Sequence, residues 1–283
     1  MNYMNLSLAW MGALNMALAL YGCTNGIETG LSAPEGIPVT VLAEISPVTK
    51  SGEAVSSDNG FDRTSFLSGD QIKVTRTKKA SGTAASQSAS YRYDGTSAWT
   101  VVGTSPVTLE PAVTYSAQFP ADYSAINQFQ TTSAAYLGSN LLKTGDATSS
   151  DGTLDFTSSG KPFTHVNSKL TLMFTVKRET SIANDAVTVA ATGIRTAVST
   201  NQTITLYRPY PGDASRKYEW CGILRAVGGS AGTSATDLTV SLTCDGVTYK
   251  ATLTGCALRT GYHPESCTIG KWTDEIMAGG NLT

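Results

Sequence analysis

The chain has 283 residues, in which 20 basic side chains nearly balance 22 acidic ones, for a formal net charge of −2 at pH 7. This balance excludes an overall field that would attract nucleic acid or an anionic membrane surface. Charged residues make up only 15% of the sequence, against roughly 25% in an average domain, and Ser, Thr, Ala and Gly are abundant. This composition favours short strands and turns, and we expect an exported all-β protein.

The first 22 residues are typical of an export signal. Residues 6–22 form the longest apolar run of the chain. The run is at the short limit for a membrane helix but suits the apolar region of a signal peptide. It has Leu20 three places before Cys23 and a glycine directly before that cysteine, which matches the bacterial lipobox. We predict a lipoprotein signal peptide over 1–22 with Cys23 as the lipid attachment site. The alternative is an ordinary signal peptide in which a cysteine falls at this place.

A lipid on Cys23 would hold the protein on a membrane without a spanning helix. Each buried CH₂ of an acyl chain contributes about 0.8 kcal/mol, and two chains give stable anchoring. The residues that follow, 23–36, are polar, contain Gly and Pro and have no periodicity. They are predicted to form a flexible tether.

The first strand pattern covers residues 37–45, with the sequence IPVTVLAEI. Its odd positions are apolar and its even positions are mostly polar, which indicates a half-buried strand. Pro38 cannot donate a ladder hydrogen bond and favours a sheet edge. The side chains predicted to face the core are Ile37, Val39, Val41 and Ile45. Their burial contributes about 1.5 to 3 kcal/mol each, so removal of this strand would leave an apolar groove with unpaired backbone.

Further strand patterns follow at short intervals, separated by Gly, Pro and Asp-Gly. They are residues 71–77, 90–93, 98–102, 113–119 and 153–157. Between them, residues 123–142 leave room for a short helix. The clearest alternation places Val166, Leu170, Leu172, Phe174 and Val176 on one face and Asn167, Lys169, Thr171, Thr175 and Lys177 on the other. A turn-rich segment precedes this strand, and we place a domain boundary there, which gives domains over 37–161 and 162–283.

Residues 238–253 predict a β-hairpin with a defined register. Asp245-Gly246 tolerates the positive φ angles of a two-residue type I′ turn. This turn pairs Cys244 with Val247, Leu242 with Tyr249, Val240 with Ala251, and Leu238 with Leu253. The apolar pattern of both strands agrees with that register, which strengthens the prediction. Successive sets of strands without helical crossovers predict two β-sandwiches in tandem.

We find no catalytic or metal-binding pattern, and we expect no enzymatic activity, no cofactor and no metal. His165 and His263 lie far apart without a nucleophile signature, and His165 is predicted to be a hydrogen-bonded structural side chain. The Gly-rich residues 227–234 lack the lysine of a P-loop. Three aspartates within 146–155 lack the spacing and the closing glutamate of a calcium loop.

Four cysteines lie in the last quarter of the chain, at Cys221, Cys244, Cys256 and Cys267. They include no C-x-x-C pair, which disfavours a zinc ribbon. They form up to two disulfides or remain small buried thiols, and the sequence leaves both open. Cys244 points inward in the predicted hairpin, while Cys256 points the other way if the strand continues without a bulge. These two are therefore not expected to bond to each other.

Residues 75–93 combine basic and aromatic side chains, as a nucleic-acid surface does. A solvated loop between the two strands of a hairpin is the simpler interpretation. Export from the cytoplasm also argues against a nucleic-acid partner.

Several segments, taken in order, carry a family resemblance. They are FLSGDQIKV (66–74), YRYDGTSAW (91–99), TYSAQFPA (114–121), SNLL (139–142), FTHVNSKLTLMF (163–174) and LRTGYHPESCTIGKW (258–272). Their order and spacing, behind a lipobox, resemble the fimbrillin family, the Mfa-like pilin precursors of Gram-negative anaerobes.

The resemblance implies two transthyretin-like β-sandwich domains, an outer-membrane lipoprotein, and assembly into a cell-surface type V pilus or its tip with a role in adhesion. The partners it implies are other pilus subunits, the membrane through the lipid, and a host or bacterial surface ligand. In that family a protease removes the first strand of the precursor, often after a basic residue. The matching position here is Lys50, where arginine is more usual, and the next is Arg63. The sequence after Trp272 has no alternating run for a donor strand, which fits a tip, anchor or minor subunit.

We therefore expect a lipid-anchored fimbrial subunit precursor that assembles by strand exchange, with residues 37–45 as the displaceable strand. The alternative is a surface glycan-binding lipoprotein of a polysaccharide-uptake system, which would expose aromatic platforms on one face. Trp99, Trp220 and Trp272 are scattered along the chain, and two of them belong to the segments above.

Overall fold

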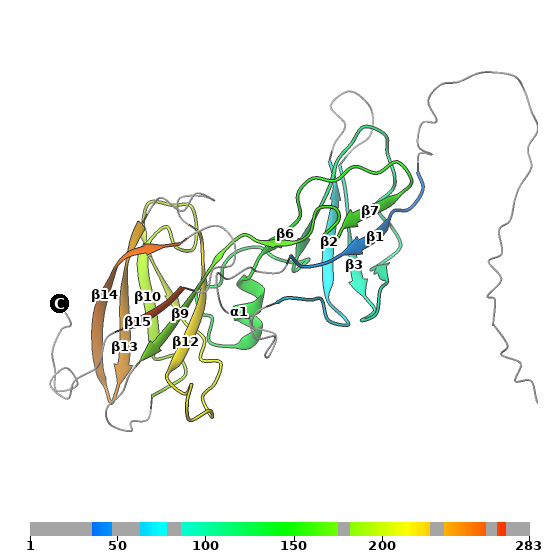
Figure 1. Ribbon diagram of the computed structural model, residues 1–283. Coiled ribbons are helices and arrows are strands. Elements are labelled where there is room, and N and C mark those ends of the chain that lie inside the picture. Colours follow the sequence, from blue (N-terminus) through cyan, green and yellow to red (C-terminus); the bar gives the residue numbers. More distant parts are fainter. Residues whose placement is uncertain are drawn as a thin grey trace, which may run out of the picture. The chain divides into compact units, whose positions relative to one another are not determined.

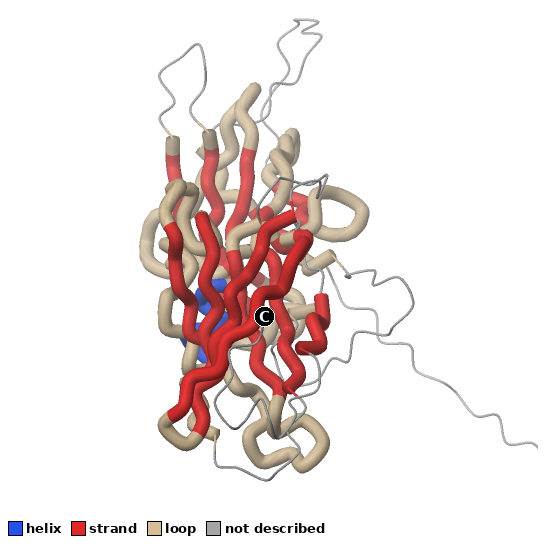
Figure 2. Tube along the Cα trace, turned by 90° about the vertical axis from the view of Figure 1, so that its left-hand side faces the viewer, coloured by secondary structure: helices blue, strands red, loops and turns tan. Residues whose placement is uncertain are grey.

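The computed structural model describes residues 36–46, 63–77, 86–174, 182–226, 235–258 and 265–269, and for the last range it describes the backbone alone. Cys23, Lys50 and the predicted signal peptide lie outside the described residues. The described chain consists mainly of strands with one short helix (Figures 1 and 2). The predicted all-β fold is confirmed.

The strands nearer the N-terminus form a six-stranded sheet and a two-stranded sheet. The six-stranded sheet is antiparallel, in the order β4 (Trp99–Val101), β3 (Gln87–Tyr93), β2 (Gln71–Arg76), β5 (Tyr115–Phe119), β6 (Leu142–Lys143) and β8 (Thr164–His165). The two-stranded sheet pairs β1 (Thr40–Ala43) with β7 (Thr153–Phe156). Apolar side chains from both sheets share one cluster, here called the N-terminal core, which contains Val41, Val74, Tyr115, Phe156 and Phe163 among others.

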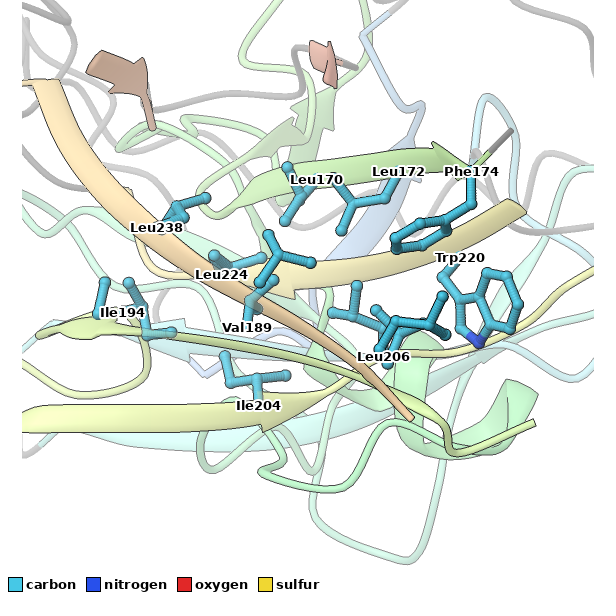
Figure 3. Packing of buried hydrophobic residues seen from close by; sticks show 14 of the residues in the cluster. Leu170, Leu172, Phe174, Val189, Ile194, Ile204, Leu206, Trp220, Leu224 and Leu238 are labelled. Carbon is cyan, nitrogen blue, oxygen red and sulfur yellow. The ribbon is translucent and has the colours of Figure 1, made fainter. Parts of the chain in front are cut away.

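The later strands form a second pair of sheets. One has the order β11 (Asn201–Thr205), β10 (Val187–Thr192), β13 (Ala235–Cys244) and β14 (Val247–Ala257). The other places β9 (Ser168–Phe174) between β12 (Glu219–Leu224), which is antiparallel to it, and β15 (Glu265–Ile269), which is parallel. Side chains from both sheets make the C-terminal core, and Figure 3 shows Leu172 and Trp220 of one sheet with Val189 and Leu238 of the other. Both pairs of sheets are thus sandwich-like.

The helix α1 (Ser133–Ser139) lies between β5 and β6 in sequence and packs against β12. It begins where the Thr132 side chain accepts a hydrogen bond from the Ala135 N–H, a common N-cap arrangement. Its Tyr136 is fully buried in a small cluster with Cys221 and Ile223. Ile126, just before this helix, belongs to the C-terminal core, whereas Phe163 belongs to the N-terminal core. The predicted boundary near residue 161 stays a prediction.

The predicted hairpin register is confirmed at all four pairs. Asp245 and Gly246 have φ angles of 50° and 77°, as the two-residue turn requires. One departure follows further along, where the pairing shifts between Thr236 and Leu238. This bulge returns Cys256 to the core that holds Cys244. The expectation that Cys256 faces away depended on a regular strand and is wrong for this reason.

Replacement of Gly246 by alanine is expected to lower the free energy of unfolding by about 1 to 2 kcal/mol, because a side chain disfavours the left-handed conformation. Gly246→Ala meets no neighbouring atom within 4 Å, so the cost is conformational alone. Gly212 also has open space around it but does not have a φ in the left-handed range, and Gly212→Ala is the matched control. Urea unfolding of both variants measures the difference, and equal losses would contradict the prediction.

Candidate functional site

The predicted displaceable strand lies at a sheet edge. β1 runs parallel to β7, with Thr40 opposite Thr153 and Ala43 opposite Phe156. Among the described residues, no other strand pairs with β1. The ladder continues past β1, since the Ser46 N–H donates to the Phe163 carbonyl at 2.8 Å. Figure 1 shows β1 in blue beside β7 in green. β1 is thus an edge strand of its two-stranded sheet, while Pro38 itself lies outside β1.

Residues 36–39 pair with a different partner, residues 107–109. The Leu109 N–H donates to the Ile37 carbonyl at 2.7 Å, and the Val39 N–H donates to the Val107 carbonyl at 3.0 Å. Pro38 lies opposite Thr108 in an antiparallel bridge, where its missing N–H is not needed. Residues 36–46 are here called the first strand. The first strand therefore changes partner between residues 39 and 40, from an antiparallel neighbour to a parallel one.

Three of the four side chains predicted to face inward are buried. Val39, Val41 and Ile45 belong to the N-terminal core, with exposed fractions of 6%, 2% and 5%. Ile37 is 44% exposed, and its predicted burial is wrong. Ile37 keeps the alternation but lies two residues before Val39, which is the first residue of the N-terminal core. The three buried side chains contribute on the order of 5 to 9 kcal/mol.

The two predicted processing residues have different surroundings. Lys50 lies outside the described residues. The Arg63 guanidinium pairs with both carboxylate oxygens of Asp70, at 3.2 and 3.3 Å, and lies over the Phe119 ring at 5.6 Å. Burial raises the pKa of the Asp70 carboxyl, although the Leu67 N–H and Arg63 oppose this. The Arg63 side chain is only 12% exposed. A protease that recognises arginine would have to pull it from these contacts, so cleavage after Arg63 requires local opening.

His165 is a structural side chain, as predicted. It is 5% exposed, and its Nδ1 lies 3.0 Å from the Asn140 Oδ1. Burial, with a smaller contribution from the Lys169 charge, lowers the pKa of the imidazole to about 4. Lys169 itself was predicted to lie on the polar face of its strand, but it is buried. That prediction is wrong because β9 is covered on both faces at this end.

Acidification is expected to destabilise the protein through His165. The unfolded imidazole takes up a proton near pH 6.5 and the folded one only near pH 4, so the free energy of unfolding falls as the pH is lowered through this range. The loss is about 3 kcal/mol by pH 4. His165→Gln removes this contribution, and the difference between the two proteins in urea unfolding at pH 7 and pH 4.5 isolates it. Equal pH dependence in both proteins would refute it.

The described residues offer no metal centre, since no three His, Cys, Asp or Glu side chains gather closely enough. Asp151 and Asp155 accept hydrogen bonds from their own turns, including those from the Thr153 and Thr157 N–H groups. No described helix is long and apolar enough to cross a membrane.

The other sequence predictions concern cysteines, tryptophans and the basic segment. Cys221, Cys244 and Cys256 are buried and are not disulfide-bonded, while the Cys267 side chain lies outside the described part. Trp99 and Trp220 are buried and offer no aromatic platform. β2 and β3 pair antiparallel, with Arg76 opposite Gln87, which confirms the strand pairing of the hairpin, while its predicted loop, 78–85, lies outside the described residues.

Comparison with known proteins relates the fold to solved structures. Searches of protein-family models and of curated proteins find no match. A crystal structure from Bacteroides ovatus, named for a suggested role in cell adhesion, aligns with a TM-score of 0.54 and 15% identity, over 82% of this chain and 91% of that one. A Bacteroides uniformis structure with the same kind of name has a TM-score of 0.50 and 11% identity, over 83% and 94%.

These two alignments cover nearly the whole length of the solved proteins. At such low identity they show a shared fold and nothing more. A fimbrial protein from Bacteroides ovatus aligns with a TM-score of only 0.39, which is too low to support an argument. The chain thus has the sandwich-like fold of these two Bacteroides proteins.

Proposed function

We propose that this protein is a lipid-anchored fimbrial subunit precursor, with a role in adhesion, that assembles at the cell surface by exchange of its first strand. The observation that carries the proposal is the place of residues 36–46. Within the described part of the chain, residues 40–43 pair only with β7 and residues 36–39 only with residues 107–109, yet together the segment supplies Val39, Val41 and Ile45 to the N-terminal core. Two proteins of the same fold are named for a suggested role in cell adhesion, and the ordered fimbrillin-like segments give independent support.

The intact precursor is capped by its own strand. Removal of residues 36–46 would open an apolar groove and leave backbone groups without partners on both sides of it. The carbonyls of Gly152, Phe156 and Phe163 would be freed on one side, and those of Val107 and Leu109 on the other. Unpaired edges of this kind are templates for a strand from another chain. The partner is therefore an extended strand of another pilus subunit.

Cleavage after Lys50 tests this proposal. Limited digestion with a trypsin-like protease should release the first strand and convert monomers into polymers, seen by size-exclusion chromatography and electron microscopy. Mass spectrometry identifies the cut. Lys50→Gln is the matched control and should stay monomeric under the same digestion. A cleaved protein that loses its first strand yet stays monomeric, also when other pilus subunits are supplied, would contradict strand exchange.

The lipid anchor is a separate part of the proposal. Cys23→Ala is expected to abolish incorporation of radiolabelled palmitate and to move the protein from the detergent phase to the aqueous phase in Triton X-114 partition, because the acyl chains supply the membrane affinity. A variant that still partitions into detergent would show that Cys23 is not the anchor.

The glycan-binding alternative gains no support from the described tryptophans. It requires exposed aromatic platforms, and the two described tryptophans, Trp99 and Trp220, are buried. A glycan array separates the two functions, since strong sugar binding without polymerisation would favour the alternative.

A further inference from the structure

We infer that residues 106–110, here called the acceptor segment, form one preformed side of the groove and remain in place when the first strand leaves. The inference rests on the proposed function and adds which residues hold the groove ready. The partner that fits is an extended strand of a second subunit that runs antiparallel to the acceptor segment and then parallel to β7.

The acceptor segment is not part of a regular sheet, and side chains replace a neighbouring strand on its inner side. Gln87 of β3 donates from Nε2 to the Pro106 carbonyl at 2.8 Å and accepts from the Thr108 N–H at 3.0 Å. Arg76 of β2 donates from Nη1 to the Thr108 carbonyl at 3.1 Å and to its Oγ1 at 2.8 Å. One amide side chain thus bonds the backbone on both sides of Val107.

Two tyrosines extend this arrangement. The Tyr91 hydroxyl accepts from the Val107 N–H at 3.0 Å. The Tyr115 hydroxyl accepts from the Glu110 N–H at 2.8 Å and donates to the Thr108 carbonyl at 3.3 Å. Both tyrosines are buried, with exposed fractions of 2% and 0%. Their hydroxyls are therefore fixed by the packing of β3 and β5, and so is the backbone that they bond.

Three other backbone groups of the acceptor segment bond to the first strand. The Val107 carbonyl accepts from the Val39 N–H, and Leu109 exchanges hydrogen bonds with Gly36 and Ile37. The bonds from Gln87, Tyr91 and Tyr115 described above do not involve the first strand. The Val107 and Leu109 side chains are fully buried and anchor the segment further. Loss of the first strand thus removes the bonds to residues 36–39 and leaves the bonds from Gln87, Tyr91 and Tyr115 in place.

The bonds that stay matter for binding, because a segment that must become ordered as its partner arrives lowers the affinity.

The bonds that are lost define what an incoming strand must offer. That strand needs N–H groups where Gly36, Val39 and Thr40 have theirs, and apolar side chains at alternate positions from Val39 onward. A proline is acceptable opposite Thr108, as Pro38 is.

Amide hydrogen exchange by NMR tests the inference directly on protein cleaved after Lys50. After the fragment is released in mild urea and removed, exchange at Leu109 should accelerate at least about tenfold. Val107, Thr108 and Glu110 should keep their rates within about threefold, because their side-chain partners remain. Equal acceleration at all four amides would overturn the inference. Failure of the fragment to leave would instead count against the proposed function.

Affinity for a labelled peptide with the sequence of residues 36–46 gives a second test on the cleaved protein. Gln87→Leu and the more conservative Tyr91→Phe should raise its Kd about five- to tenfold, since each loses a bond that orders the acceptor segment. Tyr93→Phe, on the same strand as Tyr91, is the matched control and should stay within about twofold. Unchanged affinity in folded Tyr91→Phe would overturn the inference, whereas absence of binding to wild type would refute strand exchange.

Discussion

A disulfide between positions 40 and 153 is expected to keep the protein monomeric after cleavage. Thr40 and Thr153 lie directly opposite each other in the β1–β7 register. Neighbouring strands lie about 4.8 Å apart, within the range of about 4.4 to 6.8 Å that a disulfide spans. Thr40 is exposed and Thr153 half-buried, so the substitutions disturb little packing. The oxidised Thr40→Cys/Thr153→Cys protein should be cut after Lys50 yet retain its first strand and form no polymer.

Reduction should restore release and assembly, so one sample provides both states. Size-exclusion chromatography and non-reducing gels follow the strand, and Thr40→Cys alone is the matched control. Polymerisation of the oxidised, fully cross-linked protein at the wild-type rate would mean that subunits join by another route.

Val41→Asp is expected to open the groove without any cleavage. Val41 is 2% exposed in the N-terminal core, and an unpaired carboxylate there costs about 3 to 5 kcal/mol. The first strand should leave the groove while it stays covalently attached. The uncut variant should then bind a labelled peptide of residues 36–46 about a hundred- to a thousandfold more tightly than uncut wild type does, measured by fluorescence anisotropy.

Leu42→Asp provides the control for this experiment, because the adjacent Leu42 side chain is 42% exposed. It should bind no more peptide than wild type. If Val41→Asp unfolds, Val41→Ala takes its place in the test. It weakens the packing of the first strand in the groove by removing buried apolar surface, without adding a charge. Equal binding by the Val41 and Leu42 variants would show that core burial does not retain the strand.

The sequence predicts best those elements whose turn chemistry and apolar alternation agree. The hairpin over 238–253 is the clearest case, because Asp245-Gly246 fixes a register that the apolar residues on both strands also demand. For the first strand, the sequence predicts which positions alternate but not where the buried part of the strand begins. Alternation places Ile37 and Val39 on the same side, but only the folded chain shows that the core begins at Val39.

The missed elements lack such a pattern. All six residues of β12 are buried, Glu219 and Gly222 included, so no alternation is left to detect. In addition, Gln130, far away in sequence, bonds both the N–H and the carbonyl of Ile223. The helix α1 does lie within residues 123–142, where the sequence leaves room for a short helix, but its seven residues are too few for a period that would fix its bounds. β6 and β8 have two residues each.

The acceptor segment was also missed, because its backbone bonds go to distant side chains. Gln87 and Thr108 are 21 positions apart, and Arg76 and Thr108 are 32 apart. The local signal was the alternation of Val107 and Leu109 after a proline. Nothing in that short stretch indicates that a glutamine and two tyrosines complete its hydrogen bonding.

The change of partner within the first strand has a consequence for filament architecture. The strand runs antiparallel to residues 107–109 and parallel to β7. A replacement that makes the same hydrogen bonds on both sides must run in the same direction. Where each subunit gives a strand to one neighbour and accepts a strand from another, every joint is head-to-tail, and heterologous contacts of this kind build open filaments. A fibre made of such subunits would be polar, with two structurally different ends.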